Sequence, residues 1–391
     1  MMEPSEKLKQ FSTYAFAEVD KAKDEAKRKG FRIIDFGVGD PTDSLFEGAV
    51  KGLQEGVKKH AGSGYPSYIG MKEFRTAVSE WLRKRFGVDA NPETQITATA
   101  GAKEAIFHFP FTFIDAGDAV LMPSIGYPPY KAGTVFAGGI PNYYELKEEN
   151  NFLPDLNEVE KILKSNKIKI IWMNYPHNPT TVMANKKFFK SILELAKKYN
   201  VIIASDEAYT EMYDKEKPHS ILEFTDDWDN IIAFHSLSKR SNATGLRIGF
   251  AAGGENIIKN YRILRTQIDS GVANAVQEAA IAAWKDEKHV ENMRQAYNKR
   301  REIMTNALKN MGIKYWAEAT FYIWAKVSNS IEFSKKLLQL DQKRRIGINI
   351  TPGRMLALNN AENADKYVRF ALVPSLEDTK LAADLIREHL V

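Results

Sequence analysis

The feature that most limits the fold of this chain is a regular alternation, between residues 95 and 252, of short apolar runs with helix-like segments. Runs rich in β-branched residues are typical of strands, and the segments between them are long enough for crossover helices. The expected strands are Gln95 to Thr99, Ala119 to Met122, Ile168 to Met173, Val201 to Ala204, Ile231 to Phe234 and Ile248 to Ala252. Strands that alternate with helices build a mostly parallel, doubly wound sheet, so we expect an α/β fold.

A second, smaller α+β domain is expected because 391 residues exceed what one ordinary core holds. Apolar residues at helical spacing from Val290 to Met311 predict one long helix that ends at Gly312. Beyond it we expect strands at 321–327 and 367–372, helices at 331–340 and from Leu376, and a turn at Thr351-Pro-Gly353. The first 40 or so residues should pack there too. The predicted large domain therefore spans residues 45–290, and the small domain combines 1–44 with 291–391.

Composition excludes several classes of function. The net charge of +5 is spread along the chain, which gives no indication of nucleic-acid binding. No apolar run approaches the roughly 20 residues of a membrane helix, and the N-terminus lacks the apolar segment of a signal peptide. With no cysteine and seven scattered histidines, no metal site is expected. These observations favour a cytoplasmic protein that binds neither nucleic acid nor membrane.

Polar residues gather just after the predicted strands, where open α/β sheets bind their ligands. A small-residue turn, Ala100-Gly101-Ala102-Lys103, opens a helix whose free N–H groups suit a phosphate. The other polar residues at this edge are Asn178, Asp206, Tyr209, Ser236, Ser238, Lys239 and Arg247. Each has a purely structural alternative, such as a helix cap for Asp206 or a polar turn around Lys239. A phosphate-binding P-loop is absent, and Gly37-Val-Gly39-Asp-Pro-Thr42 lacks the third glycine of the dinucleotide motif.

Taken together, these motifs resemble the class I/II aminotransferases of the pyridoxal-phosphate (PLP) fold type I. The resemblance rests on Ser236-Leu-Ser238-Lys239, Gly245-Leu-Arg247-Ile-Gly249, Asn178-Pro-Thr180 and Asp206-Glu-Ala-Tyr209, and it extends from about Asp35 to Arg369. It implies pyridoxal 5'-phosphate as the cofactor, with Lys239 as the lysine that binds it covalently, since only a primary amine can do so and then shuttle a proton.

The resemblance also assigns roles to the other residues around the cofactor. It places Asp206 at the pyridine nitrogen, Asn178 and Tyr209 at the ring hydroxyl, and Tyr127 on the ring face. It assigns the phosphate to Gly101, Ala102, Lys103, Ser236, Ser238 and Arg247. The catalytic residues implied are Lys239, Asp206 and Tyr209.

Substrate binding and assembly follow from the same resemblance. Arg369 matches the arginine that holds the substrate α-carboxylate, and Gly39 and Asn178 belong to the same substrate site. Tyr65 matches a tyrosine that reaches the phosphate of the neighbouring subunit, which implies a homodimer. The expected reaction is a ping-pong transamination between an amino acid and a 2-oxo acid.

Three short stretches of the sequence bear on the amino donor. Stretches at residues 151–155, 238–242 and 321–324 are similar to those of diaminopimelate-pathway aminotransferases, which implies LL-diaminopimelate or its N-succinyl form as donor, with 2-oxoglutarate as acceptor. Tyr68, Tyr322 and Gln267 are candidates to contact the far end of such a donor. The alternatives are aspartate aminotransferase, although its side-chain arginine has only the poorly aligned Arg265 as a counterpart, and another PLP reaction such as β-elimination. Thr181 departs from the small residue usual after Asn-Pro-Thr.

Overall fold

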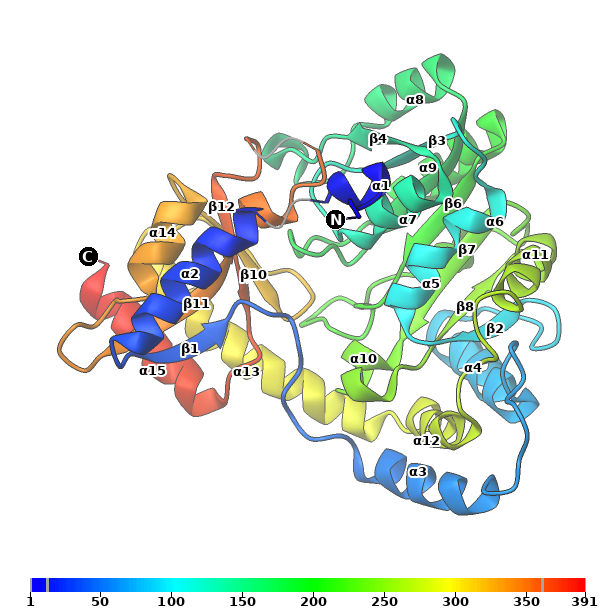
Figure 1. Cartoon of the computed structure of the whole chain (residues 1–391), viewed down its shortest axis with the longest axis horizontal. Helices are drawn as coiled ribbons and strands as arrows, with labels where there is room; N and C mark the ends of the chain where they lie inside the picture. The colour runs from blue at the N-terminus through cyan, green and yellow to red at the C-terminus, as the bar shows by residue number, and fades with distance from the viewer. Residues whose placement is uncertain (1, 12–13, 360–361, 391) are drawn as a thin grey trace.

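The computed structural model describes residues 2–11, 14–359 and 362–390, and these residues form two β-sheets flanked by helices (Figure 1). The larger sheet has the strand order β2-β8-β7-β6-β5-β3-β4, and the smaller has the order β1-β11-β12-β10-β9. In this described part of the chain, no helix combines the length and the apolar character needed to cross a membrane. The expected α/β fold is confirmed.

The larger sheet is mostly parallel. Its strands are β2 (Ile96–Thr99), β3 (Ala119–Pro123), β4 (Ile140–Tyr144), β5 (Ile168–Asn174), β6 (Ile202–Asp206), β7 (Ile231–Ser236) and β8 (Gly249–Gly253). Strands β4, β3, β5, β6 and β7 pair in parallel, whereas β8 is antiparallel to both β7 and β2. All strands except β8 therefore place their carboxyl ends along one edge.

Helices cover both faces of this sheet, so its strands are apolar on both sides. In β7, Ile231 and Ala233 belong to one core cluster and Ile232 and Phe234 to the other. Full burial of such side chains contributes roughly 1.5–3 kcal/mol each. One face is covered by α4 (Lys72–Phe86), α8 (Leu156–Ser165), α9 (Lys186–Tyr199) and α12 (Asn274–Lys285), and the other by α5 (Ala102–His108), α6 (Pro110–Phe113), α7 (Pro129–Ala137) and α11 (Glu255–Arg265).

The smaller sheet brings together both ends of the chain. Its strands are β1 (Arg32–Phe36), β9 (Tyr315–Trp316), β10 (Tyr322–Lys326), β11 (Ile346–Pro352) and β12 (Tyr367–Ala371). Strand β1 pairs in parallel with β11, and β12 is antiparallel to β11 and β10. Thr351 and Pro352 end β11 and pair with β12, so the turn predicted at these two residues is wrong; only Gly353 begins a new element, η4 (Gly353–Leu356).

The N-terminal segment contacts both halves of the molecule. Helix α2 (Tyr14–Arg28) packs on α14 (Ser330–Leu337) beside the smaller sheet, as expected. Helix α1 (Glu6–Lys9) instead lies beside α7, where Lys7 Nζ donates to the carbonyl of Phe136 at 2.8 Å (Figure 1). The expectation that the first 40 residues pack with the smaller sheet therefore holds for α2 and β1 but not for α1.

One long helix, α13 (Lys288–Asn310), connects the two sheets as predicted. It runs from α12 to α15 (Leu376–His389) beside the smaller sheet (Figure 1). The remaining helices are α3 (Glu47–Lys59), α10 (Leu237–Arg240), η1 (Glu148–Asn150), η2 (Ile221–Phe224) and η3 (Thr244–Leu246).

Candidate active site

The polar residues predicted to form the site lie at the carboxyl edge of the larger sheet. Asp206 is the last residue of β6, and Ser236 is the last of β7. Helix α10 follows β7 directly and carries Lys239, while Gly101 follows the end of β2. Strands β6 and β7 are parallel neighbours, and Asp206 pairs with Phe234, two residues before Ser236, so both strands end at the same edge.

Lys239 is a partly buried amine. Its Nζ donates to the carbonyl of Gly39 at 2.5 Å and lies 5.4 Å from the centre of the Phe321 ring. Burial lowers the pKa of Lys239 to about 8; the charge of Asp40 opposes this shift, and that of Arg369 adds to it. A fraction of this amine is therefore neutral, and nucleophilic, near neutral pH.

Asp206 is a buried carboxylate, 4% exposed, held by two donors. Tyr130 donates its hydroxyl to Asp206 Oδ2 at 2.6 Å, and the backbone N–H of Ala208 donates to Oδ1 at 3.2 Å. Burial raises the pKa of Asp206 to about 6, and these two donors limit the rise. A cation beside Asp206 would remove the cost of its buried charge.

The sequence did not predict the residues that hold this carboxylate in place. Tyr130 stacks on Trp172 with ring centroids 5.0 Å apart. Asn174, which is paired with Asp206 in register, donates to the carbonyl of Asp206 at 2.8 Å and accepts from the N–H of Asn178, also at 2.8 Å. Two signals were available: Tyr127 and Tyr130 stand three residues apart at a helix start, and Asn174 is a polar residue ending a strand.

An anion cradle lies at the start of α5. Gly101 has φ of 81° and precedes α5 without a side-chain cap, which leaves the N–H groups of the first turn free of such a cap. A Cβ on Gly101 would lie 2.6 Å from Arg247 Nη2, so glycine lets the guanidinium approach the turn. Arg247 and Lys103 are exposed; Ser236 and Ser238 are buried, with their hydroxyl oxygens 3.0 Å apart.

The smaller sheet contributes Arg369, a buried guanidinium on β12. It donates from Nη1 to Asn178 Oδ1 at 2.8 Å and from Nη2 to the carbonyl of Gly37 at 3.0 Å. Its Nε has no partner in the described structure. The structure thus joins Arg369 to Asn178, two residues that the sequence had assigned to one substrate site.

Three tyrosines proposed for the site differ in their burial and contacts. Tyr127 is partly buried, and its ring meets the edge of Tyr130 at 5.9 Å. Tyr65 is 92% exposed in the single chain. Tyr322 was a candidate for the far end of the substrate, but it is 2% exposed and its hydroxyl is 3.0 Å from that of Tyr209, so it does not line the mouth of the site.

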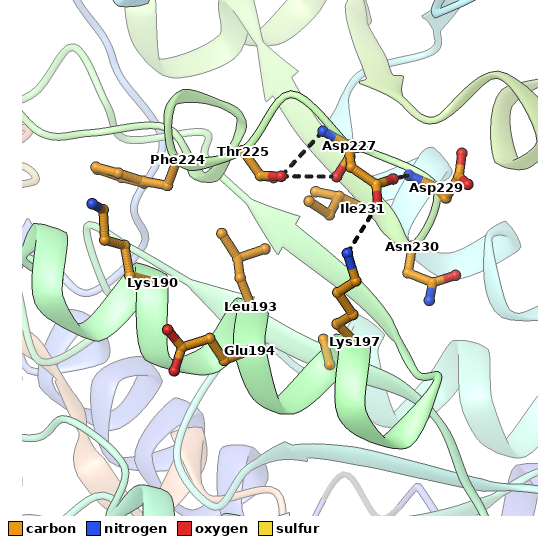
Figure 2. A pocket seen from close by; sticks show the side chains of 11 residues that line it. Lys190, Leu193, Glu194, Lys197, Phe224, Thr225, Asp227, Asp229, Asn230 and Ile231 are labelled. Carbon is orange, nitrogen blue, oxygen red and sulfur yellow. Dashed lines mark hydrogen bonds and ion pairs between the residues drawn. The ribbon is translucent and has the colours of Figure 1, made fainter.

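A separate cavity of about 320 Å³ lies between α9 and the loop before β7 (Figure 2). It is lined by Asn230 and Ile231 at the amino end of β7, whereas Lys239 follows the carboxyl end. Its charged groups also pair with each other, as Lys197 does with Asp227 at 3.6 Å (Figure 2). This cavity is therefore not part of the site around Lys239.

Comparison with known proteins agrees with this geometry. Residues 32–385 match the family described as aminotransferase class I and II. The chain is 43% identical to an LL-diaminopimelate aminotransferase of Aquifex aeolicus, with 99% of both chains covered, and 38% identical to one of Halothermothrix orenii, with 99% of this chain and 98% of the relative covered. A solved structure, the probable N-succinyldiaminopimelate aminotransferase of Thermus thermophilus, is 27% identical with a TM-score of 0.86 and covers 96% of this chain and 99% of its own. The chain belongs to the class I and II aminotransferases and is a pyridoxal-phosphate-dependent transaminase.

Proposed function

We propose that this transaminase moves an amino group from LL-diaminopimelate to 2-oxoglutarate by a ping-pong mechanism. The observation that carries the proposal is the identity of 43% and 38%, over 99% of the chain, to two proteins that bear the name LL-diaminopimelate aminotransferase. The structure supplies the groups that such a reaction needs: an amine of lowered pKa, a buried acid, an anion cradle and a buried arginine.

The described residues fit pyridoxal phosphate at this site. Asp206 carries a buried charge that a protonated ring nitrogen would balance, and the start of α5 beside Gly101 offers N–H groups to a phosphate. Lys239 follows β7, which lies between β6 and β2 in the larger sheet, and it presents a primary amine. We assign the ring hydroxyl to Asn178 and Tyr209 and the ring face to Tyr127. The phosphate is assigned to Gly101, Ala102, Lys103, Ser236, Ser238 and Arg247.

Each side chain then has a distinct task. Bound here, pyridoxal phosphate supplies a carbonyl group that exchanges amines and a ring that withdraws electrons from the substrate. Asp206 would hold a proton on the ring nitrogen, and it would do so best while it is itself charged. Lys239, as a free amine, would move a proton to and from the substrate α-carbon. Its pKa of about 8 suits both directions near neutral pH.

Recognition of the donor begins at its α-carboxylate. Arg369 offers a guanidinium fixed by Asn178, with a free Nε, and such charge-assisted bonds are the strong ones. Arg265 is the nearest candidate to bind the side-chain carboxylate of an aspartate substrate. It is fully buried, and its Nη2 donates to both carboxylate oxygens of Asp269 at 3.1 Å. This pairing favours a donor other than aspartate.

The remaining elements of the proposal concern assembly and organisation. We propose a homodimer in which the exposed Tyr65 reaches the phosphate site of the partner, and a cytoplasmic location. We also propose the division into a large domain, 45–290, and a small domain made of 1–44 and 291–391, with α1 lying against α7 of the large domain. The two sheets and the connecting helix α13 support this division.

A donor panel tests the substrate. kcat/KM is measured with 2-oxoglutarate and LL-diaminopimelate, its N-succinyl form, aspartate or alanine. The proposal expects the highest value for LL-diaminopimelate. If the N-succinyl form had the highest kcat/KM, the protein would be an N-succinyldiaminopimelate aminotransferase. If aspartate had the highest value, it would be an aspartate aminotransferase. Release of ammonia without an acceptor would indicate β-elimination instead.

A further inference from the structure

The side chain of Tyr322 touches three separate parts of the proposed site. Its hydroxyl oxygen is 3.0 Å from that of Tyr209, and the two ring centroids are 5.6 Å apart. The guanidinium carbon of Arg369 lies 4.3 Å from the centre of the Tyr322 ring. A Cβ on Gly39 would lie only 2.0 Å from the Tyr322 hydroxyl oxygen, so this hydroxyl sits directly against the Gly39 backbone.

The hydrogen count at the two hydroxyls fixes the direction of their bond. A phenol has one proton to donate and two lone pairs to accept with. In the proposed function, the Tyr209 O–H group donates a hydrogen bond to the ring oxygen of the cofactor. The contact with Tyr322 can then form only if Tyr322 is the donor. A donor into the Tyr209 oxygen polarises the Tyr209 O–H group and strengthens the hydrogen bond that Tyr209 donates by about 10–30%.

A purely structural role does not account for this hydroxyl. Tyr322 is 2% exposed and belongs to the apolar core cluster that contains Phe321 and Ile323. A phenylalanine would fill this core without burying a polar group, and burying a hydroxyl is unfavourable unless it is hydrogen-bonded. The absence of a side chain at Gly39 makes room for the hydroxyl, and the carbonyl of Gly39 also accepts from Lys239.

We propose that Tyr322 is a positioning residue for the transamination: its hydroxyl donates to Tyr209 and strengthens the bond from Tyr209 to the cofactor ring oxygen, while its ring supports Arg369. The inference rests on the proposed function of Tyr209 and Arg369 and adds a residue that links them. One side chain on β10 of the smaller sheet thereby contacts both Tyr209 and Arg369.

The test compares three single variants and one double variant by a spectroscopic titration of the cofactor-loaded, substrate-free enzyme. The readout is the pH midpoint at which the cofactor-bound nitrogen of Lys239 loses its proton. Visible absorbance follows this change. When that proton leaves, the adjacent ring oxygen depends more on protein donors, so a lost donor raises the midpoint. Tyr209→Phe should raise it most and Tyr322→Phe by a smaller amount. Tyr297→Phe, which removes another buried hydroxyl of the same cluster whose ring lies against Phe321, should leave it at the wild-type value.

Kinetic measurements distinguish the role of the Tyr322 hydroxyl from the role of its ring. Tyr322→Phe keeps the ring, so KM for amino donors should stay within about twofold of wild type while kcat falls. Tyr322→Leu removes the ring under Arg369, so KM should rise several-fold as well. In the Tyr209→Phe background, adding Tyr322→Phe should give no further shift of the midpoint, because the donor acts only through Tyr209.

The outcomes distinguish this inference from the function it rests on. A wild-type midpoint in Tyr322→Phe, with a raised midpoint in Tyr209→Phe, overturns the inference alone. A wild-type midpoint in Tyr209→Phe removes Tyr209 from the proposed site and overturns the inference with it. A shift in Tyr297→Phe equal to that of Tyr322→Phe means that any loss of a buried hydroxyl in this core has the same effect, and this also overturns it.

Discussion

Tyr130 donates a 2.6 Å hydrogen bond to Asp206, and this bond joins helix α7, on one face of the larger sheet, to the carboxylate at the end of β6. The ring of Tyr130 is fixed by its stack on Trp172. Its donor counteracts part of the rise that burial causes in the pKa of Asp206. The charge on Asp206 therefore depends on a residue outside the recognised motifs.

Removing this donor should shift cofactor binding along the pH axis. Because a hydrogen bond to a charged group contributes roughly 1.5–3 kcal/mol, Tyr130→Phe should raise the pKa of Asp206 by about one to two units. As the pH is lowered, the cofactor affinity of the apoprotein, measured by fluorescence quenching, should then begin to fall at a higher pH than in wild type. Tyr261→Phe, a buried tyrosine in the same core cluster, serves as control and should bind like wild type. Equal profiles for both variants would contradict the prediction.

The buried charge of Asp206 should also destabilise the apoprotein. The pKa of Asp206 is raised from 3.8 to about 6, so above pH 6 the folded state bears a charge that burial disfavours. Two pKa units correspond to about 3 kcal/mol. This cost disappears as the pH falls from 6 toward 4, because the folded state takes up its proton before the unfolded state does.

Asp206→Asn should therefore increase the free energy of unfolding of the apoprotein at pH 8, by up to about 3 kcal/mol, and less at pH 5. Urea unfolding at the two pH values measures the difference. The same substitution should lower kcat by orders of magnitude, because the lost charge matters most where the substrate carbon becomes negative. A variant less stable than wild type at pH 8 would show that burial does not dominate at Asp206.

Lys239→Ala should abolish transamination and leave the fold and some noncovalent cofactor binding intact, since the anion cradle is built from other residues. In wild type, borohydride reduction should fix the cofactor to a lysine, and peptide mapping should find it on Lys239. Circular dichroism of the variant provides the control for folding. Labelling of a different lysine would exclude the assignment.

The lowered pKa of Lys239 predicts how fast the cofactor attaches. Since only the neutral amine reacts, the rate of covalent attachment to the apoprotein should rise about tenfold per pH unit below pH 8 and level off above it. Asp40→Asn removes a charge that raises the pKa of this amine, so its rate should level off at a lower pH. A plateau that begins only near pH 10.5 in wild type would mean that the amine is not desolvated.

Arg369→Ala should weaken binding of every amino donor by a similar factor. Loss of a charge-assisted bond of roughly 1.5–3 kcal/mol corresponds to about a 10- to 100-fold increase in KM. The measurement compares LL-diaminopimelate, glutamate and alanine, which share only the α-amino and α-carboxylate groups. An increase confined to one donor would place Arg369 at a side chain instead of the α-carboxylate.

Periodicity predicted six of the seven strands of the larger sheet, and the reason for the miss is local. Strand β4 begins with the exposed Ile140 and contains Pro141, so it resembles an edge strand or a loop. Strand β1 and its partner β11 are separated by about 310 positions, and no local signal indicates such a pairing. Long-range contacts of this kind are set by packing, which a single sequence does not display.

The motifs predicted the groups that we assign to the chemistry, and the structure added the residues that contact them. Lys239 and Asp206 stand in recognisable patterns because their chemistry requires particular residue types. Tyr130, Asn174 and Tyr322 contact these groups through hydrogen bonds, and a tyrosine or asparagine elsewhere in a core looks the same in sequence. Their roles became visible only once α7, β5 and β10 were placed beside the site.

The parallel pairing of β1 with β11 also sets an order of events during synthesis. Residues 32–36 leave the ribosome early, yet their partners, residues 346–350, are made more than 300 positions later. The larger sheet, whose strands all lie between residues 96 and 253, can form while the chain is still growing. The N-terminal segment has no sheet to join until nearly the whole chain exists, so Gly37 and Gly39, which follow β1, reach Arg369 and Lys239 last. A nascent chain therefore acquires the contacts of Gly37 with Arg369 and of Gly39 with Lys239 only near the end of translation.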